Sequence, residues 1–225
     1  ELYHAHAQRL ALMLQNQTEE EFADSRFQVL SELTRLRQLC CDPALVYENY
    51  EGGSAKLDLC IELIQSAVES GHKILLFSQF TSMIEILTAR LQEESISYFV
   101  LQGSTKKEQR AQMVEQFNRD DTSVFCISLK AGGTGLNLTG ADIVIHYDPW
   151  WNVAVENQAT DRAHRIGQKN VVTVYKLIAK GTIEEKIIKL QQMKKELAEE
   201  ILSGDEIKTA SFQREELLEL LEERF

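Results

Sequence analysis

Short apolar runs alternate with amphipathic segments along the middle of the chain. The runs are continuous and rich in β-branched or aromatic residues: Ile74–Phe77, Tyr98–Leu101, Val124–Ile127, Ile143–His146 and Val171–Leu177. Such runs are typical of strands covered on both faces, as in a parallel sheet. Most are separated by segments with helical spacing of apolar residues, over residues 57–69, 83–92, 106–118 and 153–163. The alternation predicts a doubly wound α/β domain with ligands at the C-terminal ends of its strands.

The two ends of the chain have purely helical patterns. Pro43 is expected to end the second helix, because the residue before a proline avoids helical angles. Glycines within residues 48–54 indicate a flexible junction, and Thr182 with Glu185 resembles a capping box at the start of a long helix. We therefore expect a helical protrusion over residues 1–54, an α/β lobe over 55–181 and C-terminal helices over 182–225.

Composition indicates a globular protein of 225 residues, 44% hydrophobic and 26% charged. The sequence has no apolar stretch of membrane-spanning length, no signal-peptide start, and no metal-ligand spacing among its four cysteines. We expect a reduced, intracellular protein with no membrane partner and no bound structural metal. The net charge is -11, yet residues 150–182 hold five Lys and Arg against two Asp and Glu. Because salt confines charge effects to about 8 Å, the acidic total does not exclude a polyanionic partner.

Two segments have the chemistry of a phosphate site. Residues 128–138 (SLKAGGTGLNL) follow a predicted strand, and their three close glycines let the backbone approach a phosphate; a tight turn is the alternative. In the second segment Arg162 and Arg165 would share a helix face, with Gln158 one turn earlier. Paired guanidiniums suit a polyphosphate, and a solvated basic face is the alternative.

Two more segments offer contacts at strand ends. In residues 101–105 (LQGST), Thr105 together with Glu108 predicts a capping box whose amides could bind an anion, although ordinary helix capping is the alternative. Trp150 and Trp151 are adjacent, so both cannot easily face one core. We expect one of them to face a partner, with core packing as the alternative.

Taken in order, five segments resemble the Swi/Snf-type DNA translocase ATPases of helicase superfamily two, which include the chromatin-remodelling motors. The segments are ILLFSQF (74–80), LQGST (101–105), ISLKAGGTGLNL (127–138), DPWWN (148–152) and DRAHRIGQ (161–168). The resemblance implies the second of two RecA-like lobes, with a mainly parallel sheet, a helical protrusion before it and a brace helix after it.

The resemblance also implies roles for individual residues. Arg162 and Arg165 match arginine fingers that reach the phosphates of ATP, and Gln158 matches the polar residue that opens the same motif. The implied nucleotide contacts are Gly133, Gly135, Asp161, Arg162 and Arg165. The implied DNA contacts are Gly103, Ser104, Thr105, Ser128, Lys130, Trp151 and Asn152.

The nucleotide site implied by this resemblance is incomplete in the chain, which contains no GKT or GKS and no DExH-like run. ATP and Mg²⁺ are therefore expected to be held mainly by a first lobe of the same polypeptide, and the isolated chain is expected to fold without hydrolysing ATP. Expected partners are double-stranded DNA and a DNA-bound protein target. We expect a cytoplasmic, nucleoid-associated location if the protein is bacterial, which the compact form favours, and a nuclear one if it is eukaryotic. The alternatives are a non-catalytic DNA- or protein-binding module and a strand-separating helicase.

Overall fold

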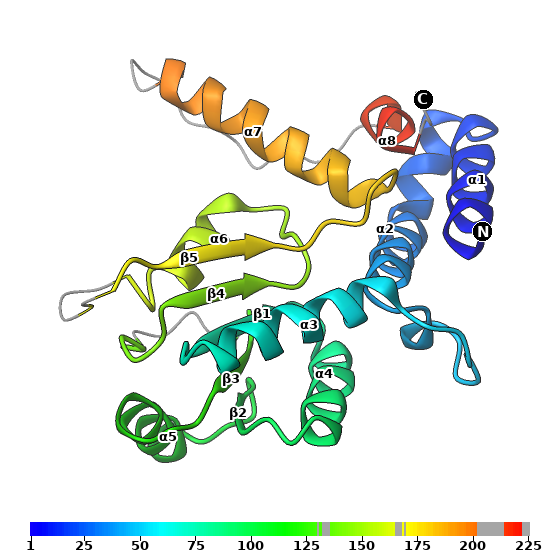
Figure 1. The fold of residues 1–225 in the computed structure, drawn as a ribbon. Helices are drawn as coiled ribbons and strands as arrows, with labels where there is room; N and C mark the ends of the chain where they lie inside the picture. The colour runs from blue at the N-terminus through cyan, green and yellow to red at the C-terminus, as the bar shows by residue number, and fades with distance from the viewer. Residues whose placement is uncertain (130, 132–135, 165–167, 169, 202–213, 222–225) are drawn as a thin grey trace. The chain divides into compact units, whose positions relative to one another are not determined.

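The computed structural model describes residues 1–129, 131, 136–164, 168, 170–201 and 214–221 (Figure 1). The chain divides into two compact units. One unit comprises Gly53–Ile178, and the other combines Glu1–Gly52 with Ala179–Phe225. The predicted sites at Lys130, Gly133, Gly135 and Arg165 lie outside the described residues.

A parallel sheet forms the centre of the unit Gly53–Ile178. Its strands among the described residues are β1 (Ile74–Ser78), β2 (Tyr98–Leu101), β3 (Val124–Ser128), β4 (Ile143–His146) and β5 (Thr173–Lys176). Their order across the sheet is β2-β3-β1-β4-β5, and each neighbouring pair is parallel. The predicted doubly wound parallel sheet is confirmed.

Helices cover both faces of the sheet, because successive strand residues point to opposite sides. Leu75 and Phe77 of β1 face a core that includes residues of α5 (Lys107–Arg119) and α6 (Val153–Thr160). The opposite face carries α3 (Ala55–Glu69) and α4 (Thr81–Glu93), which bury apolar residues such as Ile64 of α3 and Leu87 of α4. Figure 1 shows α3 in front of the strands and α6 behind them.

The last strand differs from the prediction of coverage on both faces. Every residue of β5 is exposed, whereas every residue of β1, β3 and β4 is buried. Among the described residues β5 pairs with β4 alone and ends the sheet. An apolar run therefore predicted the strand correctly but not its position at an edge.

Two helix ends also differ from the predictions. Helix α6 ends at Thr160 rather than Ala163, because the backbone N–H groups of Arg162 and Ala163 donate three residues back, to Ala159 and Thr160 at 3.2 and 3.1 Å, in a tighter turn than an α-helix. The carbonyl of Arg162 accepts from the backbone N–H of Leu138 at 3.0 Å. The capping box at Thr105 and Glu108 is wrong. Helix α5 is preceded by Lys106, without a side-chain cap among the described residues, and the Thr105 hydroxyl accepts from the backbone N–H of Gln102 at 3.1 Å.

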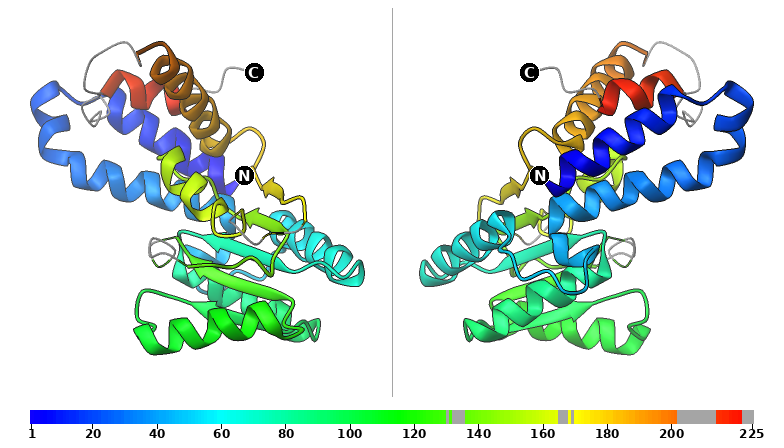
Figure 2. Two further views of the ribbon diagram at one scale, coloured as in Figure 1. Left: turned by 90° about the vertical axis from the view of Figure 1, so that its left-hand side faces the viewer. Right: turned by 90° about the vertical axis from the view of Figure 1, so that its right-hand side faces the viewer.

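The second unit is helical, as its sequence pattern predicts. It contains α1 (Leu2–Gln15), α2 (Glu19–Cys41), a short 3₁₀ turn η1 (Pro43–Leu45), α7 (Ile183–Ile201) and α8 (Arg214–Leu221). Helices α1 and α2 pack side by side, and α8 packs against α1 (Figure 2). Helix α2 ends directly before Asp42, which is extended and caps η1, so Pro43 ends the helix as predicted.

Two further observations concern the whole described chain. None of its described helices combines the length and apolarity that a membrane crossing needs.

All four cysteines are buried thiols. Burial raises the pKa of the Cys60 thiol to about 12, because the thiolate loses its hydration.

Candidate functional site

The segments predicted to bind ligands gather at one edge of the sheet. Parallel strands end at the same edge, and the register pairs Ser78 with Ser128, Leu101 with Ile127 and Phe77 with His146. The LQGST loop, the start of the glycine-rich segment and the DPWWN segment therefore all leave the sheet on its carboxyl side. Ser128 itself is the last residue of β3 and is buried, with 3% of its surface exposed.

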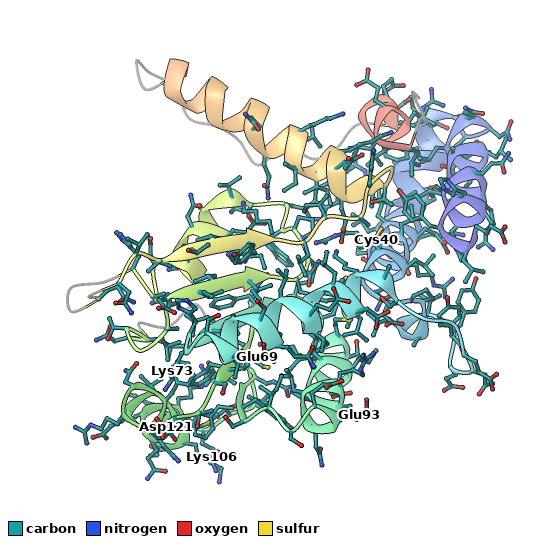
Figure 3. The ribbon with its side chains drawn as sticks, in the orientation of Figure 1. Cys40, Glu69, Lys73, Glu93, Lys106 and Asp121 are labelled. Atoms are coloured by element: carbon teal, nitrogen blue, oxygen red, sulfur yellow. The ribbon has the colours of Figure 1, made fainter. Side chains whose placement is uncertain are left out.

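The Gln102–Thr105 loop is held by Arg110, a residue of α5 to which the sequence analysis assigned no role. Arg110 Nε donates to the carbonyl of Thr105 at 2.8 Å, and Nη2 donates to the carbonyls of Gln102 and Gly103 at 3.2 and 3.0 Å. Its Nη1 also lies 3.5 Å from the carbonyl of Ala131. Gly103 and Ser104 are exposed, and Lys106, labelled in Figure 3, is exposed at the start of α5.

Asp148, the first residue of DPWWN, is buried with 1% of its surface exposed. Its Oδ1 accepts from Ser78 Oγ at 2.5 Å, and its Oδ2 accepts from the backbone N–H of Gln79 at 3.2 Å. The carboxylate thus joins the loop after β4 to the loop after β1. The sequence analysis placed both segments in one ordered set of motifs, but such a set does not indicate which residues contact each other.

An ion pair between a buried glutamate and a partly exposed lysine fixes the segment that follows. Glu156 of α6 is 1% exposed, and its Oε1 accepts from the backbone N–H of Trp150 at 2.6 Å. Its Oε2 lies 2.5 Å from Lys176 Nζ at the end of β5. Trp150 packs against the core, and Trp151 is half-buried. The exposed Asn152 caps α6, accepting from the backbone N–H of Ala154 at 2.9 Å.

His146, the last residue of β4, interacts electrostatically with this pair. Its ring stacks on Phe77 with centroids 5.5 Å apart, and its Nε2 is 3.0 Å from Thr160 Oγ1. Burial lowers the pKa of His146 to about 4, with Lys176 acting in the same direction and the Glu156 carboxylate opposing it. The imidazole is therefore neutral near pH 7 and serves as part of the packed core.

The arginine segment differs from the shared helix face that the sequence predicted. Gln158 is exposed on α6, but the helix ends before Arg162, which lies in the following turn. Arg162 is 2% exposed, whereas Asp161 beside it is exposed. A guanidinium that contacts a ligand across a cleft must be accessible, so Arg162 is not in that position here.

Gln168, the last residue of DRAHRIGQ, has a structural position that the sequence analysis did not assign. Its Nε2 donates to the carbonyls of Ala141 at 2.6 Å and of Thr139 and Ala163 at 3.2 Å. Its Oε1 accepts from the backbone N–H of Asn170 at 2.9 Å. One amide therefore joins the turn after α6 to the loop before β4.

The fold and the strand-end segments together define the C-terminal lobe of a helicase-type ATPase. Residues 55–167 match the family described as helicase conserved C-terminal domain. The SWI2/SNF2 ATPase core of Sulfolobus solfataricus, solved in complex with double-stranded DNA, superimposes with a TM-score of 0.74 at 34% identity, covering 90% of this chain and 42% of that one. The chain belongs to the Swi2/Snf2 ATPase family, in which it forms the RecA-like C-terminal domain.

Curated relatives agree with this membership. An uncharacterised ATP-dependent helicase of Mycoplasma pneumoniae is 45% identical over 202 residues, which is 88% of this chain and 19% of the relative. The human chromatin-remodelling ATPase INO80 is 44% identical over 169 residues, 75% of this chain and 11% of that protein. The chain thus spans about a fifth of the first of these relatives and less of the second.

Proposed function

We propose that this chain is the second motor lobe of an ATP-dependent translocase on double-stranded DNA. The observation that carries the proposal is the gathering of the LQGST, glycine-rich and DPWWN segments at one sheet edge within a Swi2/Snf2 C-terminal domain. A related core has been solved with double-stranded DNA. In this role the lobe grips DNA while the nucleotide is held between it and a first lobe of the same polypeptide.

The DNA grip would act on backbone phosphates and so be independent of sequence. The exposed loop at Gly103 and Ser104 and the half-buried Thr105 offer backbone and hydroxyl donors, and the half-buried Trp151 offers an aromatic edge. Asn152 is exposed, although its side-chain oxygen already caps α6. Ser128, being buried, would act by placing Lys130 rather than by contact.

The nucleotide contribution would come from Arg162 and Arg165, with Gln158 and Asp161 beside them and Gly133 and Gly135 in the preceding loop. Guanidinium groups fit the charge and geometry of a triphosphate, and such fingers are worth about 10³–10⁵ in rate. The proposal requires that Arg162, buried here, becomes accessible when ATP and the first lobe are in place. Mg²⁺ would be held by the first lobe, where it would neutralise phosphate charge.

The partners and the location belong to the same proposal. The lobe would work with double-stranded DNA and, in a motor of this kind, with a DNA-bound protein as the object that is moved. Strand separation is not required, because tracking needs only an alternating grip. The location would be the bacterial cytoplasm, at the nucleoid, or the nucleus in a eukaryote.

A non-catalytic DNA- or protein-binding module is the second candidate, and the burial of Arg162 favours it. The test is the single substitution of Arg162→Ala and of Arg165→Ala in the protein that carries both lobes. We expect DNA-stimulated ATP hydrolysis to fall at least about 10³-fold in each variant. Arg119→Ala, which removes an exposed arginine of α5 paired with Glu115, is the matched control and should retain the wild-type rate.

ATP hydrolysis near the wild-type rate in both variants would contradict the assignment of Arg162 and Arg165 as arginine fingers. The non-catalytic binding module would then be the remaining candidate function. Purified as the 225-residue chain alone, the lobe should show negligible ATP hydrolysis, and measured turnover would contradict the proposed division between two lobes.

A further inference from the structure

Arg110 contacts the Gln102–Thr105 loop through its main-chain carbonyls. Nε and Nη2 together reach the carbonyl oxygens of Gln102, Gly103 and Thr105 at 2.8–3.2 Å. The planar guanidinium presents its donors in a fixed fork, so three simultaneous contacts hold the loop in one conformation. The Thr105 hydroxyl adds a further contact by accepting from the backbone N–H of Gln102 at 3.1 Å.

These carbonyl contacts determine where the amides of the loop point. In a trans peptide the carbonyl of one residue and the N–H of the next point in opposite directions. Because the carbonyls of Gln102, Gly103 and Thr105 face Arg110, the N–H groups of Gly103, Ser104 and Lys106 face away from it. Gly103 and Ser104 thus supply two successive outward N–H groups and Lys106 a third, whereas the N–H of Thr105 donates to the carbonyl of Gln102 at 3.1 Å. Outward N–H groups in a turn suit an anion.

The surface at this loop is open to an approaching group. Gly103 and Ser104 are exposed, and a Cβ added at Gly103 would meet nothing within 4 Å. Lys106, also exposed, adds positive charge at the next position. A phosphate could therefore reach the three amides without displacing a side chain of the loop.

We infer that Arg110 is a positioning residue for DNA binding: it aims the amides of the Gln102–Thr105 loop at a backbone phosphate without touching the DNA itself. The inference rests on the proposed function, since it names what orients one of the proposed DNA contacts. Arg110 then acts through the geometry of its guanidinium, and a positive charge alone at this position is insufficient to orient the loop for DNA binding.

The test compares Arg110→Lys and Arg110→Ala with Arg119→Lys in the two-lobe protein, using a mixed-sequence DNA duplex. Lysine keeps the charge but loses the planar fork. We expect Arg110→Lys to raise both the Kd for the duplex, measured by fluorescence anisotropy, and the DNA concentration for half-maximal ATPase stimulation about tenfold. The rate at saturating DNA should change less than about twofold, because the lost interaction is a binding one. Arg119→Lys, at an exposed position of the same helix, should match the wild type.

The outcomes separate the two proposals. Wild-type affinity in Arg110→Lys would overturn the positioning role while leaving the translocase intact; if Arg110→Ala then lost affinity, the charge of Arg110 would be what matters. A wild-type protein that neither binds the duplex nor responds to it would overturn the proposed function and this inference together. If Arg110→Ala does not fold, Arg110→Lys decides, with Gly103→Val as a second variant. The valine side chain would occupy the open surface at the amides, so an unchanged Kd for the duplex in Gly103→Val would also overturn the inference.

Discussion

Ser78 Oγ lies 2.5 Å from Oδ1 of Asp148, although 70 positions separate the two residues in the chain. Both are buried, and the same carboxylate accepts from the backbone N–H of Gln79. The contact links the carboxyl ends of the neighbouring strands β1 and β4. In the strand order of this sheet the connections from β1 and β4 run in opposite directions, so this is the switch point where ligands of doubly wound sheets bind. Asp148 therefore holds together the two loops that flank that position.

The first prediction concerns this contact. Asp148→Ala should lower the free energy of unfolding by about 2–4 kcal/mol, because it removes a buried acceptor and leaves the Gln79 N–H without that partner. Ser78→Ala should cost less, about 1–2 kcal/mol, because it removes the hydrogen bond to Asp148 and the one that Ser78 Oγ accepts from the backbone N–H of Phe80 at 3.2 Å. Urea unfolding of the 225-residue chain measures both values. Equal losses in the two variants would show that the carboxylate has no role beyond its bond to Ser78.

The second prediction concerns the pair of Glu156 and Lys176. Glu156 is 1% exposed, whereas the Lys176 side chain is 38% exposed. Lys176→Met would leave a buried carboxylate without its cation and should cost about 3–5 kcal/mol. Glu156→Gln keeps an acceptor for the Trp150 N–H and leaves a lysine that water can reach. It should therefore lower the free energy of unfolding by less than Lys176→Met does.

The double variant checks the argument. Lys176→Met combined with Glu156→Gln should recover part of the stability lost by Lys176→Met alone, because no charge remains buried. Thermal or urea unfolding of the three variants gives the comparison. A double variant less stable than either single one would contradict an electrostatic origin.

The third prediction concerns pH. The folded state lowers the pKa of His146 to about 4, against about 6.5 in an unfolded chain. Between these values the unfolded chain binds more protons, so stability is fully present above about pH 6.5 and falls as the pH drops toward 4, by up to about 1.4 kcal/mol per unit. The unfolding midpoint of the wild type should therefore fall more steeply with decreasing pH than that of His146→Gln. Parallel pH profiles would exclude His146 as the cause.

The helices and strands could be predicted from periodicity wherever burial follows the local pattern. The apolar runs at β1 to β4 and the end of α2 before Pro43 are examples. Helix α6 shows the limit of this reasoning, because its sequence pattern continues past Thr160 while the backbone changes to a tighter turn whose Arg162 carbonyl accepts from the distant Leu138. The exposure of β5 depends likewise on which elements pack against it, and no short window of sequence contains that information.

The amino-acid order alone was enough to reveal the alternation of elements and the Swi2/Snf2 resemblance, and it predicts which segments bind DNA and nucleotide. Each of these is read from local spacing or from a short ordered motif. Strand order, the contacts of Arg110 and Asp148 and the burial of Arg162 emerged with the folded chain. They depend on hydrogen bonds and packing between residues far apart in sequence, where direction and distance matter as much as residue type.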